Sequence, residues 1–161
     1  MDRVIDFGCG TAEILDYLPS VEYFGFDISH NYIQSAQLRF GKRAHFECRM
    51  ITEQDAPDLP KFDIALAIGV LHHMDDETAN SLLRAAFAVL NKGGRLVTID
   101  PCYDPNQSAC ACFFVSRDRG QNIRDLAGYS SVAESVFTNT AAIVRHQAWL
   151  PYTHCIMECT K

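Results

Sequence analysis

A glycine-bearing turn near the amino terminus is the segment of this sequence best suited to hold a small ligand. It reads DFGCGTAE over residues 6–13, after a short apolar run. Glycines at a strand end let backbone amides approach a ligand beside the positive end of the following helix. Asp27 ends the next apolar run, seventeen residues after Gly10, where a carboxylate can accept both hydroxyls of a ribose. The spacing predicts a nucleoside-containing cofactor; the alternative is a βα turn that holds no ligand.

Position 13 separates the two kinds of cofactor that use this geometry. A dinucleotide site requires the pattern G-x-G-x-x-G, because the pyrophosphate rests on amides at the start of the helix. The last glycine of that pattern is replaced here by Glu13, whose carboxylate would compete with a phosphate for that position. The turn therefore favours an adenosine ligand without a pyrophosphate, and an NAD-dependent enzyme is the weaker alternative.

Two adjacent histidines, His72 and His73, follow a nearly continuous apolar run. Histidine titrates near neutral pH, so either ring could take a proton from a hydroxyl or an amine. The alternative is that one ring packs beneath the loop or hydrogen-bonds a carbonyl group. Both are therefore candidate catalytic residues.

The densest basic cluster is formed by Arg117, Arg119 and Arg124. Arginine forks suit a carboxylate or phosphate group, so an anionic substrate is one expectation and a solvated loop with internal ion pairs is the other. Cys110 and Cys112 have the spacing C-x-C without histidine partners nearby, so no metal site is predicted.

Short apolar runs alternate with amphipathic stretches along the chain. This is the pattern of an open parallel sheet with helices on both faces, and Phe62–Val70 is apolar enough to be its central strand. Ser29 and Asp76 are expected to cap helices, and Asn91–Gly94 to end the second of them. The other expected elements are the strands Val4–Phe7, Tyr23–Phe26, His45–Cys48 and Arg95–Ile99 and the helices Ala12–Leu18 and His30–Phe40.

The last two expected strands, Ala141–Gln147 and Tyr152–Cys159, are separated only by Ala148–Pro151. A parallel crossover needs a dozen or more residues. The two strands are therefore predicted to pair as an antiparallel hairpin.

Composition limits the class of protein and its partners. The chain has 161 residues, 48% of them hydrophobic, which suffices for one globular domain. Its net charge is −6 and it has no run of lysine or arginine, so neither nucleic acid nor a membrane surface is an expected partner. Seven cysteines without a C-x-x-C pair favour free thiols in the cytoplasm over a disulfide framework.

Taken together, these segments resemble the class I S-adenosylmethionine-dependent methyltransferases. VIDFGCGTAE is similar to the first motif of that family, with Ala12 in place of its third glycine, and GFDIS is similar to the acidic end of its second strand. FDIALAIGVLHHM and LNKGGRLVTID are similar to its fourth and fifth strands. The resemblance implies one Rossmann-like α/β domain over residues 1–161, with a seven-stranded sheet in the order 3-2-1-4-5-7-6 and strand seven antiparallel.

The resemblance also implies S-adenosyl-L-methionine as cofactor and S-adenosyl-L-homocysteine as product. Asp27 would bind the ribose, Ile28 would pack on the adenine, and Met50 would cover the ring where family members often carry an acid. Backbone at Gly8 and near Ile68 would take the methionine amino group. The full expected set of cofactor-binding residues is Asp6, Gly8, Cys9, Gly10, Asp27, Ile28, Met50, Ile68 and Gly69.

The sequence therefore predicts methyl transfer to a small-molecule acceptor, with oligomerisation left open. Positioning does most of the work in such an in-line displacement, so no catalytic triad is required. A non-catalytic domain that binds the cofactor through an incomplete site is the alternative. Enzymes of this resemblance usually carry helices before the first strand; this chain starts two residues before its own, so we expect those lid helices to be absent and the cleft to be partly open.

Overall fold

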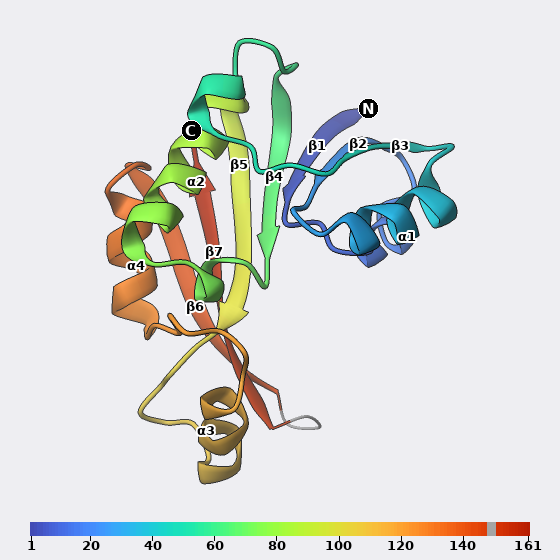
Figure 1. The fold of residues 1–161 in the computed structure, drawn as a ribbon. Helices are drawn as coiled ribbons and strands as arrows, with labels where there is room; N and C mark the ends of the chain where they lie inside the picture. Colours follow the sequence, from blue (N-terminus) through green and yellow to red (C-terminus); the bar gives the residue numbers. More distant parts are fainter. Residues whose placement is uncertain (148–150) are drawn as a thin grey trace.

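One seven-stranded sheet organises the described residues, 1–147 and 151–161, of the computed structural model (Figure 1). The order is β3-β2-β1-β4-β5-β7-β6, with the first five strands parallel and β7 antiparallel to both neighbours. This confirms the order and the hairpin predicted above. The strands are β1 (Asp2–Phe7), β2 (Val21–Phe26), β3 (Ala44–Glu47), β4 (Phe62–Ile68), β5 (Leu90–Pro101), β6 (Asn139–Gln147) and β7 (Tyr152–Thr160).

Helices cover both faces of the sheet, because successive side chains of a strand point to opposite sides. Val4 packs in a cluster with α1 (His30–Phe40), whereas Ile5 belongs to the cluster that includes α2 (Asp76–Val89) and α4 (Leu126–Glu134). The helix α3 (Ala109–Ser116) stands apart, beyond the carboxyl ends of the strands (Figure 1). Ligands of such sheets bind outside the carboxyl ends, where the strand order reverses between β1 and β4.

Side-chain caps set the starts of the two main helices. Ser29 caps α1 as predicted, accepting a hydrogen bond from the Tyr32 amide at 3.4 Å. The cap of α2 is Asp75, which accepts from the Thr78 amide at 2.8 Å, so the predicted cap Asp76 is wrong by one residue. Asp75 has an extended backbone and can therefore reach back to that amide, whereas Asp76 already lies in the first helical turn.

The helix predicted over Ala12–Leu18 does not form, and the segment makes a single 3-10 turn, Glu13–Asp16. Ala12 has a φ of 57°, a left-handed conformation that a right-handed helix cannot include. Pro19 disfavours the helical conformation in the residue before it. The few residues left between them cannot offset the cost of starting an α-helix.

Two other boundaries complete the comparison with the predicted elements. α2 ends at Val89 and β5 begins at Leu90, so the predicted helix stop at Asn91–Gly94 lies within β5. In the predicted link Ala148–Pro151, residues 148–150 lie outside the described residues. Among the helices that the structure describes, none has the length and apolarity to cross a membrane.

Candidate functional site

A cavity of about 640 Å³ opens at the carboxyl ends of β1, β2 and β4. This size is typical of a small-molecule site, and its place is the point where the strand order reverses. Its walls come from the glycine turn, the loop after β3, the loop after β4 and α2. It brings together seven of the nine predicted cofactor residues: Gly8, Gly10, Asp27, Ile28, Met50, Ile68 and Gly69.

The other two predicted residues, Asp6 and Cys9, are buried and do not line the cavity. Cys9 packs against Gly25, where an added Cβ would lie 2.8 Å from the cysteine sulfur. Asp6 is 3% exposed and accepts a hydrogen bond from the Tyr23 hydroxyl at 2.5 Å. Its other oxygen, Oδ1, has no partner among the described residues. A buried carboxylate oxygen without a partner, two residues before Gly8, fits a ligand that brings a hydrogen-bond donor to the turn.

Burial raises the pKa of Asp6 to about 7; the Tyr23 hydrogen bond opposes the rise and the charge of Asp27 adds to it. Such a group stabilises the folded state fully below its unfolded pKa near 3.8, and the contribution is lost as the pH rises through about 7. We expect the free energy of unfolding of the ligand-free protein to fall by up to about 4 kcal/mol over this range.

Urea unfolding at a series of pH values checks this expectation, with Asp6→Asn as the matched variant. Asparagine has the same shape but does not titrate, so the variant should lack the fall. Identical pH profiles for the two proteins would show that Asp6 is not the titrating group.

Three amides of the glycine turn, those of Gly8, Cys9 and Gly10, already have acceptors within the chain. The N–H groups of Gly8 and Cys9 donate to the Phe26 carbonyl at 2.7 and 3.0 Å, and that of Gly10 donates to Asp27 Oδ2 at 3.0 Å. A phosphate needs free N–H donors here, so the turn is poorly suited to a pyrophosphate. A methionine ammonium group needs acceptors instead, which backbone carbonyl oxygens supply.

Two backbone hydrogen bonds fix the Asp27 carboxylate before any ligand arrives. Gly10 donates to Oδ2, and the Ser29 amide donates to Oδ1 at 2.7 Å. An ionised carboxylate has about four acceptor positions, so room remains for two ribose hydroxyls. The side chain is thus held in one orientation on the cavity wall.

Ile28 and Met50 form an apolar rim of the cavity and are 73% and 52% exposed. A flat base lying against them would remove this surface from water. Arg49, which also lines the cavity, contacts the carboxylates of Glu47 and Asp55 at 2.7 and 2.6 Å. Its positive charge is therefore already matched by acids of its own loop.

Outside the glycine turn, three hydroxyl side chains on the cavity wall were missed by the sequence analysis: Tyr32, Thr78 and Ser81. They come from α1 and α2, which the fold brings to opposite sides of the same cavity. No local motif marks them, because each is an ordinary helix residue within its own segment.

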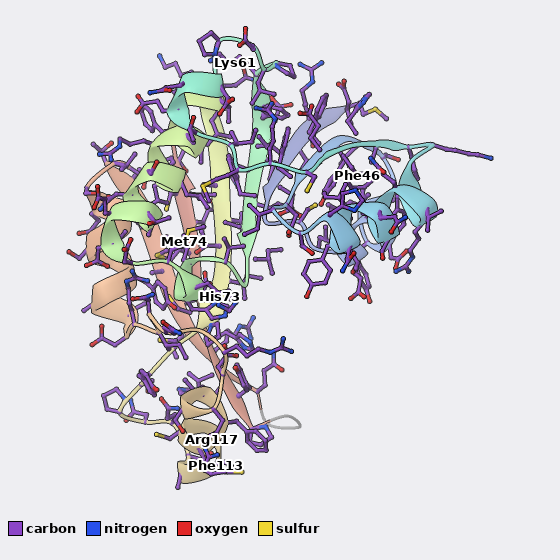
Figure 2. The ribbon with its side chains drawn as sticks, in the orientation of Figure 1. Phe46, Lys61, His73, Met74, Phe113 and Arg117 are labelled. Carbon is purple, nitrogen blue, oxygen red and sulfur yellow. The ribbon has the colours of Figure 1, made fainter. Side chains whose placement is uncertain are left out.

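The two candidate catalytic histidines occupy different environments. His73 lines the cavity next to Met74, in the loop after β4 (Figure 2). His72 is 5% exposed, and its Nδ1 and Nε2 lie 2.9 and 3.3 Å from carboxylate oxygens of Asp100 and Asp118. The two imidazole rings are in contact, with their centroids 3.9 Å apart and their planes tilted by 41°. His73 is thus the ring that faces the cavity, and His72 packs beneath the loop.

The predicted arginine cluster does not converge on the cavity. Arg124 donates to the carbonyl oxygens of Leu71 and Met74 at 3.0 and 2.8 Å and so braces the histidine loop from behind. Arg117 lies at the end of α3 beside Phe113 (Figure 2), with its guanidinium carbon 5.1 Å from that ring's centroid, and does not line the cavity. Of the three, Arg119 remains as an exposed side chain whose charge acts on the site.

Comparison with known proteins places these features in a family. Residues 5–96 match the family model described as a methyltransferase domain, and this stretch contains the turn, Asp27 and both histidines. The chain is 36% identical over 104 residues to the uncharacterised protein syc1184_c of Synechococcus sp., covering 58% of this chain and 24% of that protein. It is 27% identical over 147 residues to phosphoethanolamine N-methyltransferase 1 of Arabidopsis thaliana, covering 87% of this chain and 29% of the relative.

Among solved structures, the S-adenosylmethionine-dependent methyltransferase SibL superposes with a TM-score of 0.79. The match covers 99% of this chain and 50% of SibL at 20% identity, and it supports the fold alone. The chain therefore spans about a quarter of the length of the two curated relatives and half of SibL.

Proposed function

The chain belongs to the methyltransferase-domain family, and from that premise we propose that it binds S-adenosylmethionine and transfers the methyl group to a small-molecule acceptor. One observation carries the proposal: the glycine turn and Asp27 lie on the wall of one cavity, where the Gly10 amide donates a hydrogen bond to the Asp27 carboxylate. Asp27 offers acceptors for a ribose. Asp6 Oδ1, buried beneath the turn, has no hydrogen-bond partner among the described residues. The name of SibL, which shares this fold, specifies the same cofactor.

A nicotinamide dinucleotide suits this cavity less well. Its two phosphate charges would meet Glu13 and Asp27 on the wall. Arg49 is the one lysine or arginine among the lining residues, and Glu47 and Asp55 already pair with it. The amides of Gly8, Cys9 and Gly10 also have acceptors within the chain. The cavity therefore offers a pyrophosphate few hydrogen-bond donors and no unpaired cation among its described lining residues.

When bound, the cofactor would supply an electrophilic methyl group on a sulfonium, so the chain must chiefly align the acceptor and exclude water. His73 is the proposed proton acceptor. Burial and then the neighbouring His72 hold the pKa of His73 below its ordinary value, although Asp118 and Asp100 oppose this. The ring is therefore neutral at neutral pH and can take a proton from a hydroxyl or an amine.

A small amine that also carries an anionic group is the acceptor class that we propose first. The Arabidopsis relative is named for phosphoethanolamine, which has both groups. A protonated amine must lose a proton before it can attack, which gives His73 a task. The exposed Arg119, whose charge lowers the pKa of His73, is the residue that we propose to meet the anion. We also propose a cytoplasmic location, supported by seven free cysteines.

Replacing His73 with glutamine should lower kcat by about a hundredfold or more, the usual loss when a general base is removed. Affinity for S-adenosylhomocysteine should stay within about threefold of the wild type, a difference of less than 1 kcal/mol, because His73 does not lie at the ribose or adenine positions. Steady-state kinetics at saturating cofactor and calorimetry measure the two quantities. Met74→Leu is the matched control, a volume-conserving change at the neighbouring lining residue. An unchanged kcat in His73→Gln would remove His73 from the mechanism.

The proposed function is tested by incubating the protein with S-adenosylmethionine and three acceptors: phosphoethanolamine, ethanolamine and a neutral alcohol of similar size. Mass spectrometry follows the methylated product and S-adenosylhomocysteine together. We expect both to appear with phosphoethanolamine, and neither to appear without an acceptor. Cofactor binding without product from any acceptor would contradict the proposal and favour the non-catalytic domain.

A further inference from the structure

A segment between α3 and α4, residues 117–124, holds the histidine loop in place; we call it the strap. The amide of Asn122 donates to the carbonyl of His72 at 2.9 Å. The guanidinium of Arg124 donates to the carbonyls of Leu71 and Met74. Strap residues thus donate hydrogen bonds to three of the four backbone carbonyls over residues 71–74. These bonds hold the histidine loop against the strap.

The strap also holds the His72 side chain. Its Nε2 lies 3.3 Å from Asp118 Oδ1 on the strap, while its Nδ1 lies 2.9 Å from Asp100 Oδ1 on β5. The His72 amide donates to the same Asp100 oxygen at 3.2 Å. Both ring nitrogens and both backbone polar groups of His72 are therefore engaged, which leaves the ring one orientation.

Gly120 closes the remaining space around the His72 ring. A Cβ added at Gly120 would lie 2.1 Å from His72 Cδ2 and 2.8 Å from the His72 carbonyl oxygen. Its backbone is not in the left-handed region, so the requirement for glycine here is one of space. The strap backbone rests directly on the imidazole ring.

Asp118 is itself fixed as an ionised acceptor. Its Oδ2 accepts a hydrogen bond from the Tyr152 hydroxyl, and its Oδ1 accepts from the Gly120 amide at 2.8 Å. Partial burial would raise the pKa of Asp118, but these hydrogen bonds and the nearby His72 and His73 outweigh it and hold the pKa below the usual range. Because an ionised carboxylate only accepts hydrogen bonds, Asp118 favours a proton on the Nε2 of His72 that faces it.

We propose that Asp118 and Gly120 are positioning residues for methyl transfer: they lock the His72 ring, and the contact of that ring with the His73 ring sets the orientation and burial of His73. Neither residue lines the cavity, so both act through His72 rather than on the acceptor. The inference rests on the proposed function, in which His73 receives the proton. The inference assigns a positioning role in catalysis to the buried contacts of His72 with Asp100, Asp118 and Gly120, none of which lines the cavity.

The charged groups that act on His73 come from three elements: His72 in its own loop, Asp100 on β5, and Asp118 and Arg119 on the strap. A variant that adds or removes a charge would alter several of these electrostatic effects on His73 at once. An uncharged change at Gly120 avoids this problem, because it moves the His72 ring without adding or removing a charge. Burial is the largest cause of the low pKa of His73, so displacing the ring beneath it should raise that pKa.

The test is an NMR titration of the His73 Cε1–H resonance in the ligand-free wild type and in Gly120→Ala, with the resonance assigned from His73→Gln. We expect the titration midpoint of His73 to move upward in Gly120→Ala. Gly93→Ala is the matched control: it adds the same methyl group near the start of β5, outside the cavity and with no atom within 4 Å of the added Cβ, and it should leave the His73 midpoint unmoved. An unmoved His73 midpoint in folded Gly120→Ala would overturn the inference.

A second variant keeps the test decisive if Gly120→Ala does not fold. Asp118→Ala removes the acceptor facing His72 Nε2, on a partly exposed side chain. The slowly exchanging Nε2–H resonance of His72 should be lost, and kcat should fall while the affinity for S-adenosylhomocysteine stays unchanged. Retention of both the resonance and kcat would overturn the inference.

Calorimetry with S-adenosylhomocysteine separates this inference from the function on which it rests. A wild type that does not bind the ligand overturns the proposed function and the inference together. Binding by the wild type, with no change at His73 or His72 in the variants, overturns the positioning role and leaves the proposed function standing.

Discussion

Replacing Asp27 with alanine should weaken binding of S-adenosylhomocysteine by about a hundredfold or more. The carboxylate is expected to accept two ribose hydroxyls, and hydrogen bonds to a charged group contribute about 1.5–3 kcal/mol each. The loss should be large because the two backbone bonds from Gly10 and Ser29 hold the carboxylate in place before binding. Isothermal titration calorimetry measures the change directly.

The control for Asp27→Ala is Asp16→Ala. Asp16 is a more exposed acid that pairs with Arg39 at the surface and does not line the cavity. Its removal should leave the affinity within about twofold of the wild type, since exposed ion pairs contribute little. Thermal unfolding of both variants confirms that they are folded. An Asp27→Ala affinity within about threefold of the wild type would end the assignment of Asp27 to the ribose.

Gly8→Ala is expected to have the second large effect, on both stability and binding. Gly8 has a φ of 72°, and an added Cβ would lie 2.7 Å from Val70 Cγ2. The left-handed backbone costs a non-glycine residue about 1–2 kcal/mol, and displacing Val70 adds about 1–3 kcal/mol. Because the glycine turn and the loop after β4 meet at this contact, the shift should also abolish measurable cofactor binding.

Gly93→Ala isolates the backbone part of that effect. Gly93 has a φ of 79° but no atom within 4 Å of an added Cβ, and it lies outside the cavity. Gly93→Ala should be destabilised only by the cost of a left-handed backbone at a non-glycine residue. It should keep its affinity for S-adenosylhomocysteine. Urea unfolding and calorimetry on both variants give the comparison. Equal losses of stability, with binding kept in both, would mean that the approach of Gly8 to Val70 does not shape the site.

The sheet could be predicted because its signals are local or carried by family resemblance. Apolar runs mark β1, β2 and β4, and a four-residue link forces the final hairpin. The helix expected after the glycine turn failed for a reason that residue types do not reveal, namely the left-handed backbone of Ala12. The cap of α1 at Ser29 was predicted correctly, whereas the cap of α2 was wrong by one residue because two acids, Asp75 and Asp76, are adjacent.

The cavity lining around the glycine turn was largely predictable, whereas the surroundings of the two histidines were not. Seven predicted cofactor residues line one cavity, because motif residues follow strand ends and strand ends meet. His72 and His73 are neighbours in the chain, and only packing against Asp100 and the strap separates a buried ring from a cavity-facing one. The sequence analysis considered Arg124 a candidate to bind an anion. In the structure its guanidinium instead donates hydrogen bonds to carbonyls of the histidine loop.

The most direct test of the central claim is calorimetric titration of the wild-type chain with S-adenosylhomocysteine and, side by side, with NAD. The account predicts one site for S-adenosylhomocysteine and no measurable binding of NAD, because the amides of Gly8, Cys9 and Gly10 are occupied and Glu13 and Asp27 line the cavity with no unpaired lysine or arginine among the described lining residues. Binding of NAD without binding of S-adenosylhomocysteine would contradict it.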